Sequence, residues 1–152
     1  MTKVFRIAFL ALFLWIPIAV LAADEPVSFS RGEISIASKD GKSHPFTVEL
    51  ALTAAQRELG LMHRTTLGAN AGMLFDFGET REVMMWMKNT DLALDMLFID
   101  SRGEIVHIAS RTTPFSENII SSGAPVKYVL EINAGRAEAL QISPGDRVAL
   151  PH

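Results

Sequence analysis

Short segments in which apolar and polar residues alternate, separated by turn residues, are the feature of this chain that most constrains its fold. Residues 33–37 (EISIA) and 46–50 (FTVEL) alternate and flank an Asp-Gly turn, which predicts a β-hairpin. Residues 95–100 and 104–109 flank a turn that contains glycine and predict a second hairpin. Alternation with a period of two places one set of side chains on each face of a sheet, so the pattern favours strands.

The rest of the chain predicts more strands and two short helices. Thr53 and Gln56 have the spacing of a capping box, so a helix is predicted to begin there and to end at Gly60. Asn133 is predicted to cap a second helix over residues 134–140. Further strands are predicted at residues 73–77, 82–88, 126–132 and 147–150, with a long loop at 112–123. The expected fold is mainly β (α+β), a compact single-domain barrel or sandwich with two short helices.

The first residues have the pattern of a secretion signal. Lys3 and Arg6 precede an apolar run at residues 7–21, and Ala22 and Ala23 follow it. Cleavage is expected after either alanine. The alternative is an uncleaved anchor, although the run is shorter than the roughly 20 residues that span a bilayer.

The predicted signal covers residues 1–23, which leaves residues 24–152 as one β-rich domain. We therefore expect an exported protein, periplasmic or extracellular, that would meet a membrane only through an uncleaved signal. Removing the signal takes two of the 14 basic residues and none of the 17 acidic ones, so the net charge falls from −3 to −5. An acidic protein lacks the electrostatic footprint of a nucleic-acid-binding protein. The chain has no cysteine, which excludes disulfides, thiol catalysis and thiolate metal sites.

The segment at residues 85–100 (MWMKNTDLALDMLFID) contains more polar groups than a strand and a turn require. Trp86 and Lys88 are expected on one face of a strand, with Met85 and Met87 on the other face in the core. One interpretation is a loop tied by its own hydrogen bonds, with Trp86 in the core. The other is the wall of a polar pocket, because burying such groups without partners is costly.

Residues elsewhere complete the candidate site. Arg64 follows the first predicted helix and is expected either to pair with a carboxylate or to clamp an anionic or hydroxyl-rich ligand. Glu131 lies in an apolar strand and is expected to face either solvent or a polar cavity. The candidate ligand-binding residues are Arg64, Trp86, Lys88, Asn89, Asp95 and Glu131.

Several motifs, in order along the chain, carry a resemblance to a known family. These are GLMHR at 60–64, GMLFDF at 72–77, MWMKNT at 85–90 with LDMLFID at 94–100, and YVLEINAG at 128–135 with a late GD at 145–146. The chain resembles domain of unknown function 192, also called uncharacterised protein family 0127, over about residues 46–150. The resemblance implies a small β-rich fold, often behind a secretion signal, and it implies no catalytic residue because the family's function is not established. The chain departs from the family pattern at Met85, where an aromatic residue is common, and at residues 91–93, where an Ile-Pro pair is usual.

No metal site or cofactor is expected. The four histidines, His44, His63, His107 and His152, lack the spacing of zinc ligands. The methionines of the mature chain lie in apolar segments and are expected to fill the core rather than bind copper. The sequence also lacks a phosphate-binding glycine loop and a nucleophile elbow.

Three functions remain open from the sequence. The first is a non-catalytic module that binds a polar small molecule or glycan-like ligand in a cleft. The second is a hydrolase of a glycan-like substrate that uses Asp95 and Glu131 as a carboxylate pair, or Lys88 next to an acid. The carboxylate pair would require the two groups to face each other across the cleft. The third is an accessory protein of the cell envelope that docks a protein partner through an apolar surface.

Overall fold

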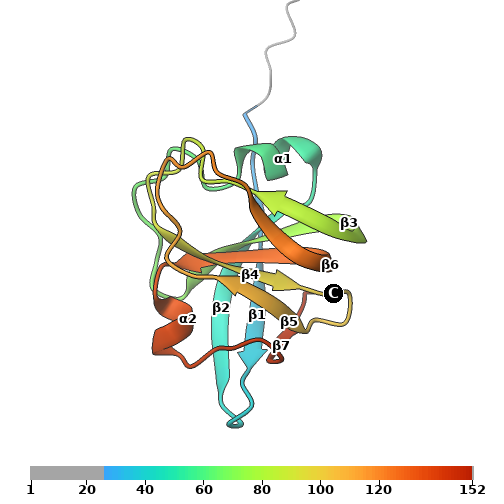
Figure 1. Cartoon of the computed structure of the whole chain (residues 1–152). Coiled ribbons are helices and arrows are strands. Elements are labelled where there is room, and N and C mark those ends of the chain that lie inside the picture. The colour runs from blue at the N-terminus through green and yellow to red at the C-terminus, as the bar shows by residue number, and fades with distance from the viewer. Residues whose placement is uncertain (1–25, 152) are drawn as a thin grey trace, which may run out of the picture.

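The computed structural model describes residues 26–151 and shows a seven-stranded sheet that curls into a half-barrel, with two short helices (Figure 1). The predicted secretion signal lies outside the described residues. The elements are β1 (Ser30–Ala37), β2 (Ser43–Ala51), α1 (Ala54–Leu59), β3 (Ala71–Met85), β4 (Leu94–Ile99), β5 (Ile105–Ala109), β6 (Ile120–Asn133), α2 (Arg136–Ala139) and β7 (Arg147–Ala149). The strand order is β5-β4-β6-β3-β2-β1-β7. The predicted fold class is therefore confirmed.

The two edge strands of the sheet approach each other. A single antiparallel bridge joins Glu104, just before β5, to Arg147 of β7. The backbone N–H of Val148 also donates to the carbonyl of Gly103 at 2.8 Å. These contacts satisfy backbone groups that an open edge would leave unpaired.

The predicted hairpins form as expected, since β1 pairs antiparallel with β2 and β4 with β5. The β2–β3 pair is parallel, and α1 lies in the connection between the two strands. Thr53 and Gln56 form the predicted capping box, and Gly60 follows the helix with a positive φ of 48°. Among residues 26–151, no helix has the length and apolar content that crossing a membrane requires.

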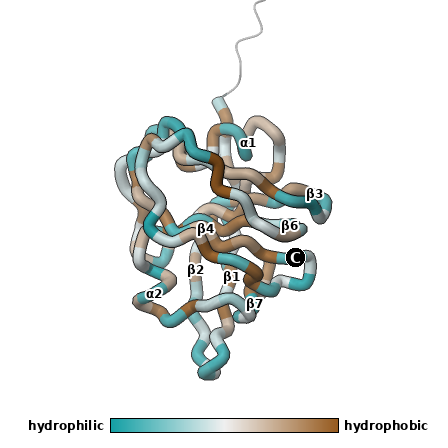
Figure 2. Tube along the Cα trace, in the orientation of Figure 1, coloured by the Kyte–Doolittle hydropathy of each residue, from teal (hydrophilic) through white to brown (hydrophobic). Residues whose placement is uncertain are grey.

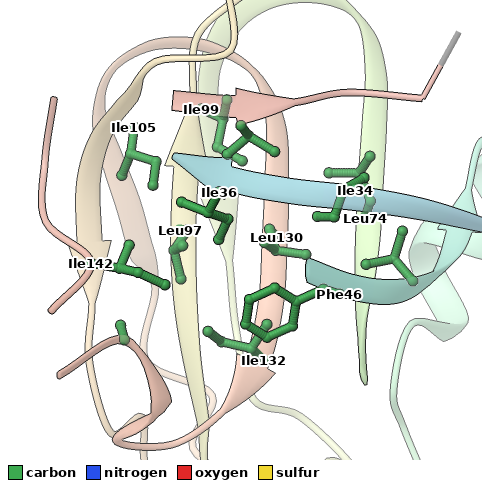
Figure 3. Close-up of a cluster of buried hydrophobic side chains, with 13 residues drawn as sticks. Ile34, Ile36, Phe46, Leu74, Leu97, Ile99, Ile105, Leu130, Ile132 and Ile142 are labelled. Carbon is green, nitrogen blue, oxygen red and sulfur yellow. The ribbon is translucent and has the colours of Figure 1, made fainter. Parts of the chain in front are cut away.

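The sheet has an apolar core on each of its faces. Side chains in the interior of the curl point toward one another from several strands (Figure 3). They include Ile34, Ile36, Phe46, Leu74, Leu97, Leu130 and Ile132. A second cluster lies on the outer face, with Met73, Phe75, Met87, Met96, Phe98 and Val129. In β6 the alternation assigns Leu130 and Ile132 to the interior, and Val129 and Glu131 to the outer face.

The sequence predictions were wrong about several element boundaries. Residues 73–77 and 82–88 were predicted as two strands, but β3 is one strand that continues through an irregularity between Asp76 and Arg81. Its partner β6 begins at Ile120, so the predicted loop at 112–123 is shorter. In Figure 2 the hydrophobic start of β6 stands out against the hydrophilic β1–β2 turn.

The second helix also differs from its prediction. α2 is a single turn, Arg136–Ala139, and Asn133 does not cap it. The Asn133 amide instead donates to the carbonyls of Leu67 and Gly68, at 3.1 and 3.0 Å. The residue at the N-cap of α2 is Gly135, which has no side chain to accept a hydrogen bond.

Candidate functional site

A small pocket lies against the outer face of the sheet, below α1. Its volume is about 130 Å³. Its walls come from segments far apart in the sequence: residues 57–62, Phe75 and Phe77, residues 84–86, Thr90 and Glu131. Three of the sequence motifs therefore converge on one pocket, together with Glu131 from the fourth.

Glycines let the walls of this pocket approach one another. A Cβ atom on Gly60 would lie 3.2 Å from Cζ of Phe75, and one on Gly72 would lie 2.6 Å from the backbone oxygen of Glu131. The second distance is shorter than real Cβ contacts. Close packing thus explains why Gly60 begins the GLMHR motif and Gly72 begins the GMLFDF motif. A larger residue at either position would push α1 or β3 away from the pocket.

Glu131 supplies the one buried carboxyl group of the pocket, among the residues that the structure describes. Its side chain is 4% exposed, and its neighbours across the sheet are Met73 of β3 and Met96 of β4. Within residues 26–151 no hydrogen bond or ion pair reaches this carboxyl, and burial raises its pKa to about 8. Desolvation penalises the charged form, so the group is mainly protonated at neutral pH.

Trp86 stands at the mouth of the pocket and is 44% exposed. The Lys88 ammonium nitrogen lies 5.2 Å from the centroid of the Trp86 ring, a cation–π contact. Met87 is buried in the core and Met85 is partly buried, as predicted from the alternation. Trp86 itself was predicted as core in the tied-loop interpretation, and its exposure contradicts that part of it.

The turn after Trp86 is tied to two other segments by its backbone. Asn89 has a positive φ of 54°, and its carbonyl accepts the backbone N–H of His63 at 2.9 Å. The Thr90 hydroxyl donates to the carbonyl of Lys88 at 3.1 Å, and the Thr90 carbonyl accepts the N–H of Phe115. These bonds fix Thr90 in the pocket wall. The turn is therefore both a tied loop and part of a pocket.

Arg64 lies in a neighbouring pocket, separated from the first by Leu61, which lines both. Its guanidinium makes two hydrogen bonds to the Glu49 carboxylate, at 3.2 and 2.5 Å, and lies 5.7 Å from the centroid of the Phe29 ring. The ion pair is one of the two roles that the sequence predicted for Arg64. Two N–H groups that could clamp a ligand are thus already engaged by Glu49.

Asp95 lines none of the pockets around Trp86 and is fully buried. One carboxylate oxygen accepts the backbone N–H groups of Arg111 and Gly135, at 2.8 and 3.0 Å, and the other accepts that of Ala137 at 2.9 Å. Asp95 pairs with Ile132 across the sheet and so faces the interior, whereas Glu131 faces outward. The two carboxyl groups lie on opposite faces of the sheet and do not form a pair.

The structure thus brings Trp86 and Glu131 into one pocket, with Lys88 and Asn89 at its border. Arg64 lies in the adjoining pocket and Asp95 lies elsewhere. The sequence reasoning did not include Arg57, Met62, Phe75 or Thr90 among the candidate ligand-binding residues, although all of them line the pocket. The motifs GLMHR, GMLFDF and MWMKNT contain three of these four residues, so the motifs could have indicated these residues as candidates.

The methionines mostly pack in the outer core, as predicted, with Met73, Met87 and Met96 fully buried. Met84 is an exception, because its side chain is 65% exposed. In the part of the chain that the structure describes, no group of three or more His, Asp or Glu side chains is placed to hold a metal ion.

Comparisons with known proteins agree with the fold. A protein from Sinorhizobium meliloti 1021, which carries the name of a proposed transcription regulator, is 53% identical and has a TM-score of 0.80, covering 82% of this chain and 96% of its own. A protein of unknown function from Novosphingobium aromaticivorans DSM 12444 is 36% identical and has a TM-score of 0.78, covering 84% of this chain and 91% of its own. No curated protein matches the chain. The model of family DUF192, described as "Uncharacterized ACR", matches residues 35–150, and the chain therefore belongs to the DUF192 family.

Proposed function

We propose that this protein is a binding module for a small polar molecule, which enters the pocket beneath α1. The observation that carries the proposal is the convergence of separate motifs on a pocket that contains an unpaired buried carboxyl group, that of Glu131. A carboxyl group that lines a pocket and has no hydrogen-bond partner among the described residues is available to a molecule that enters the pocket. A ligand that pairs with Glu131 would offset part of the cost of burying this group.

The size of the pocket supports a small ligand over a glycan chain. Pockets for drug-sized ligands usually enclose about 300–1,000 Å³. The pocket here has a volume of about 130 Å³. This space suits a molecule of a few heavy atoms, or one protruding group of a larger molecule.

A hydrolase that uses Asp95 and Glu131 is not supported by the geometry. Carboxylate pairs in glycosidases face each other across the substrate at about 5–10 Å. Asp95 instead faces the interior of the curl and accepts three backbone hydrogen bonds, while Glu131 faces the outer pocket. We therefore do not propose this reaction.

A second candidate function is docking of a protein partner in the cell envelope. Its support is the set of large apolar side chains that stay exposed near the pocket mouth: Met84, Trp86, Phe115 and Ile119. Met84 and Ser121 face each other in the β3–β6 pair, and Met85 pairs with Ile120, so Ile119 lies close to Trp86. Exposed large apolar side chains that lie near one another are typical of an interaction site.

The name of the Sinorhizobium neighbour raises the question of nucleic-acid binding. A net charge of −3 for the whole chain opposes that function, because binding to phosphates requires clustered Lys and Arg. We propose an exported protein instead, on the strength of the charged start, apolar run and small residues at its N-terminus.

A thermal-shift screen tests the binding function. A ligand that binds only the folded state raises the melting temperature. The screen would compare amines, amides, small carboxylic acids, amino acids and monosaccharides on the wild-type protein and on Trp86→Ala. We expect at least one class to raise the melting temperature of the wild type and to act less on the variant. A flat response to every class would contradict the proposal.

A further inference from the structure

We infer that the molecule which this pocket binds is a small organic ammonium ion, held by the Glu131 carboxylate and the aromatic wall. The inference rests on the proposed binding function and specifies the ligand's charge. It is carried by three features of the pocket: an acid without a counter-ion, aromatic rings in the wall, and a cation of the chain already placed on one of these rings.

The first feature is the missing counter-ion of Glu131. Of the described residues that line the pocket, Arg57 is the one cation. Its Nη1 donates to the carbonyls of Leu52 and Asp76, at 2.6 and 2.8 Å, and its guanidinium lies 5.6 Å from the centroid of the Phe77 ring. Arg57 is thus held by the segment before α1 and by β3, and it makes no hydrogen bond to Glu131. A cationic group of the ligand would supply the missing counter-ion of Glu131.

The second feature is the aromatic wall. Phe75, Phe77 and Trp86 line the pocket together with Glu131. Aromatic faces attract cations through the ring quadrupole, and alkylammonium groups are recognised in this way. Apolar side chains such as Leu61 and Met62 suit the alkyl part of the same ligand.

The third feature is a cation of the chain that lies against a ring of the pocket wall. The Lys88 ammonium already lies 5.2 Å from the centroid of the Trp86 ring. Lys88 does not line the pocket, so its charge sits beside the pocket and not within it. An anionic ligand would be repelled by Glu131 once this acid ionises. A polyhydroxylated ligand would find few free hydrogen-bonding groups, since the Thr90 hydroxyl is already bonded to the Lys88 carbonyl.

Binding of an ammonium ion should release a proton. Burial raises the pKa of Glu131 to about 8, so below that pH the empty pocket holds a protonated acid, and the cation binds only after the proton leaves. The other charged groups of the pocket are Arg57 and Glu58 of α1, while the flanking strands present Met73 and Met96, which carry no charge. Affinity should therefore rise with pH up to about 8 and then level off.

Isothermal calorimetry with three probes of one shape tests the charge of the ligand. The probes are tert-butylammonium, the neutral tert-butanol and the anionic pivalate, at pH values on both sides of 8. Above pH 8 we expect tert-butylammonium to bind at least about tenfold more tightly than tert-butanol, and pivalate not to bind. Below pH 8, buffers that differ in ionisation enthalpy should reveal close to one proton released per cation bound.

Three variants locate the binding charge. Glu131→Gln should weaken tert-butylammonium at least about tenfold, whereas the control Glu33→Gln, an exposed acid of β1 that does not line the pocket, should change it less than about threefold. Lys88→Met removes a positive charge beside the pocket, so it should tighten tert-butylammonium and leave tert-butanol unchanged. Circular dichroism and melting temperatures check that each variant is folded.

The failure of this inference can be told apart from the failure of the proposed function. If tert-butanol or pivalate binds as tightly as tert-butylammonium, or if folded Glu131→Gln binds the cation like the wild type, the ammonium assignment is wrong but the pocket still binds small molecules. If no probe and no compound of the thermal-shift screen binds, both are wrong.

Discussion

The Asp95 carboxylate of β4 accepts the backbone N–H of Ala137, at 2.9 Å, and so caps the first turn of α2 from a distant strand. The same side chain accepts the N–H groups of Gly135 and Arg111, so one buried acid fixes both α2 and the loop that begins near residue 111. Hydrogen bonds from backbone N–H groups to a carboxylate are stronger than those to a neutral acceptor, and Asp95 is fully shielded from water.

Asp95→Asn should therefore destabilise the protein strongly. The amide keeps one acceptor oxygen, but its NH₂ group would face an N–H donor and leave it unsatisfied. We expect a loss of about 3 kcal/mol in the free energy of unfolding, measured by urea denaturation. The exposed Asp91→Asn is the matched control and should change stability by less than about 0.5 kcal/mol. Equal stability of the two variants would mean that Asp95 does not cap α2.

The buried Glu131 predicts a pH dependence of stability. Its pKa is raised from 4.5 to about 8 in the folded protein, so between these values the folded state holds a proton that the unfolded state has lost. Stability contributed by the protonated acid is therefore lost as pH rises, by about 1.4 kcal/mol per pH unit in this window.

Glu131→Gln cannot titrate and supplies the reference for this prediction. The difference in unfolding free energy between wild type and variant should move in favour of the variant from about pH 5 to pH 8 and level off above. Urea denaturation at several pH values measures it. A constant difference across the range would show that the carboxyl is solvated or paired.

The Arg64–Glu49 ion pair is expected to contribute little to stability. The two side chains are 34% and 20% exposed, and partly exposed ion pairs usually contribute about 0.2–1 kcal/mol. A double-mutant cycle with Arg64→Ala and Glu49→Ala should give a coupling energy in this range. Ligand binding in the Glu131 pocket should be unchanged by Arg64→Ala, because Leu61 separates the two pockets; a large loss of binding would instead make Arg64 part of the site.

Thr53 is expected to stabilise the protein by capping the N-terminus of α1. Its hydroxyl accepts the N–H of Gln56 at 3.2 Å, and the Gln56 side-chain oxygen accepts the N–H of Thr53 at 2.9 Å. Thr53→Ala should cost about 1 kcal/mol, and Thr53→Ser should cost much less because it keeps the acceptor. Thermal unfolding of the pair of variants measures both, and equal melting temperatures would argue against the cap.

The export proposal has a direct test. If the signal is cleaved, the protein from the cell envelope or medium should begin at Ala23 or Asp24. Mass spectrometry of the N-terminus decides it. An intact N-terminal segment in a membrane fraction would support the uncleaved anchor.

The sequence by itself determined the elements whose signals are local. Hairpin turns and alternation placed β1, β2, β4 and β5, and the spacing of Thr53 and Gln56 placed α1. These features depend on neighbours along the chain, so a pattern of a few residues is sufficient. The motifs that carry the family resemblance also contain most of the residues that line the pocket. Their sequence does not show that these segments lie side by side in the folded protein.

Only the tertiary structure decided what depends on contacts between distant segments. Asn133 has the residue type of a helix cap, yet its amide bonds Leu67 and Gly68, and Asp95, 40 residues before Gly135, does the capping. The sequence left Glu131 between solvent and a cavity, because alternation gives the face of a strand but not what covers that face. Glu131 is buried in a pocket whose walls come from α1, β3 and Thr90. The physical reason is that burial depends on segments that are distant in the sequence and meet only in the folded protein.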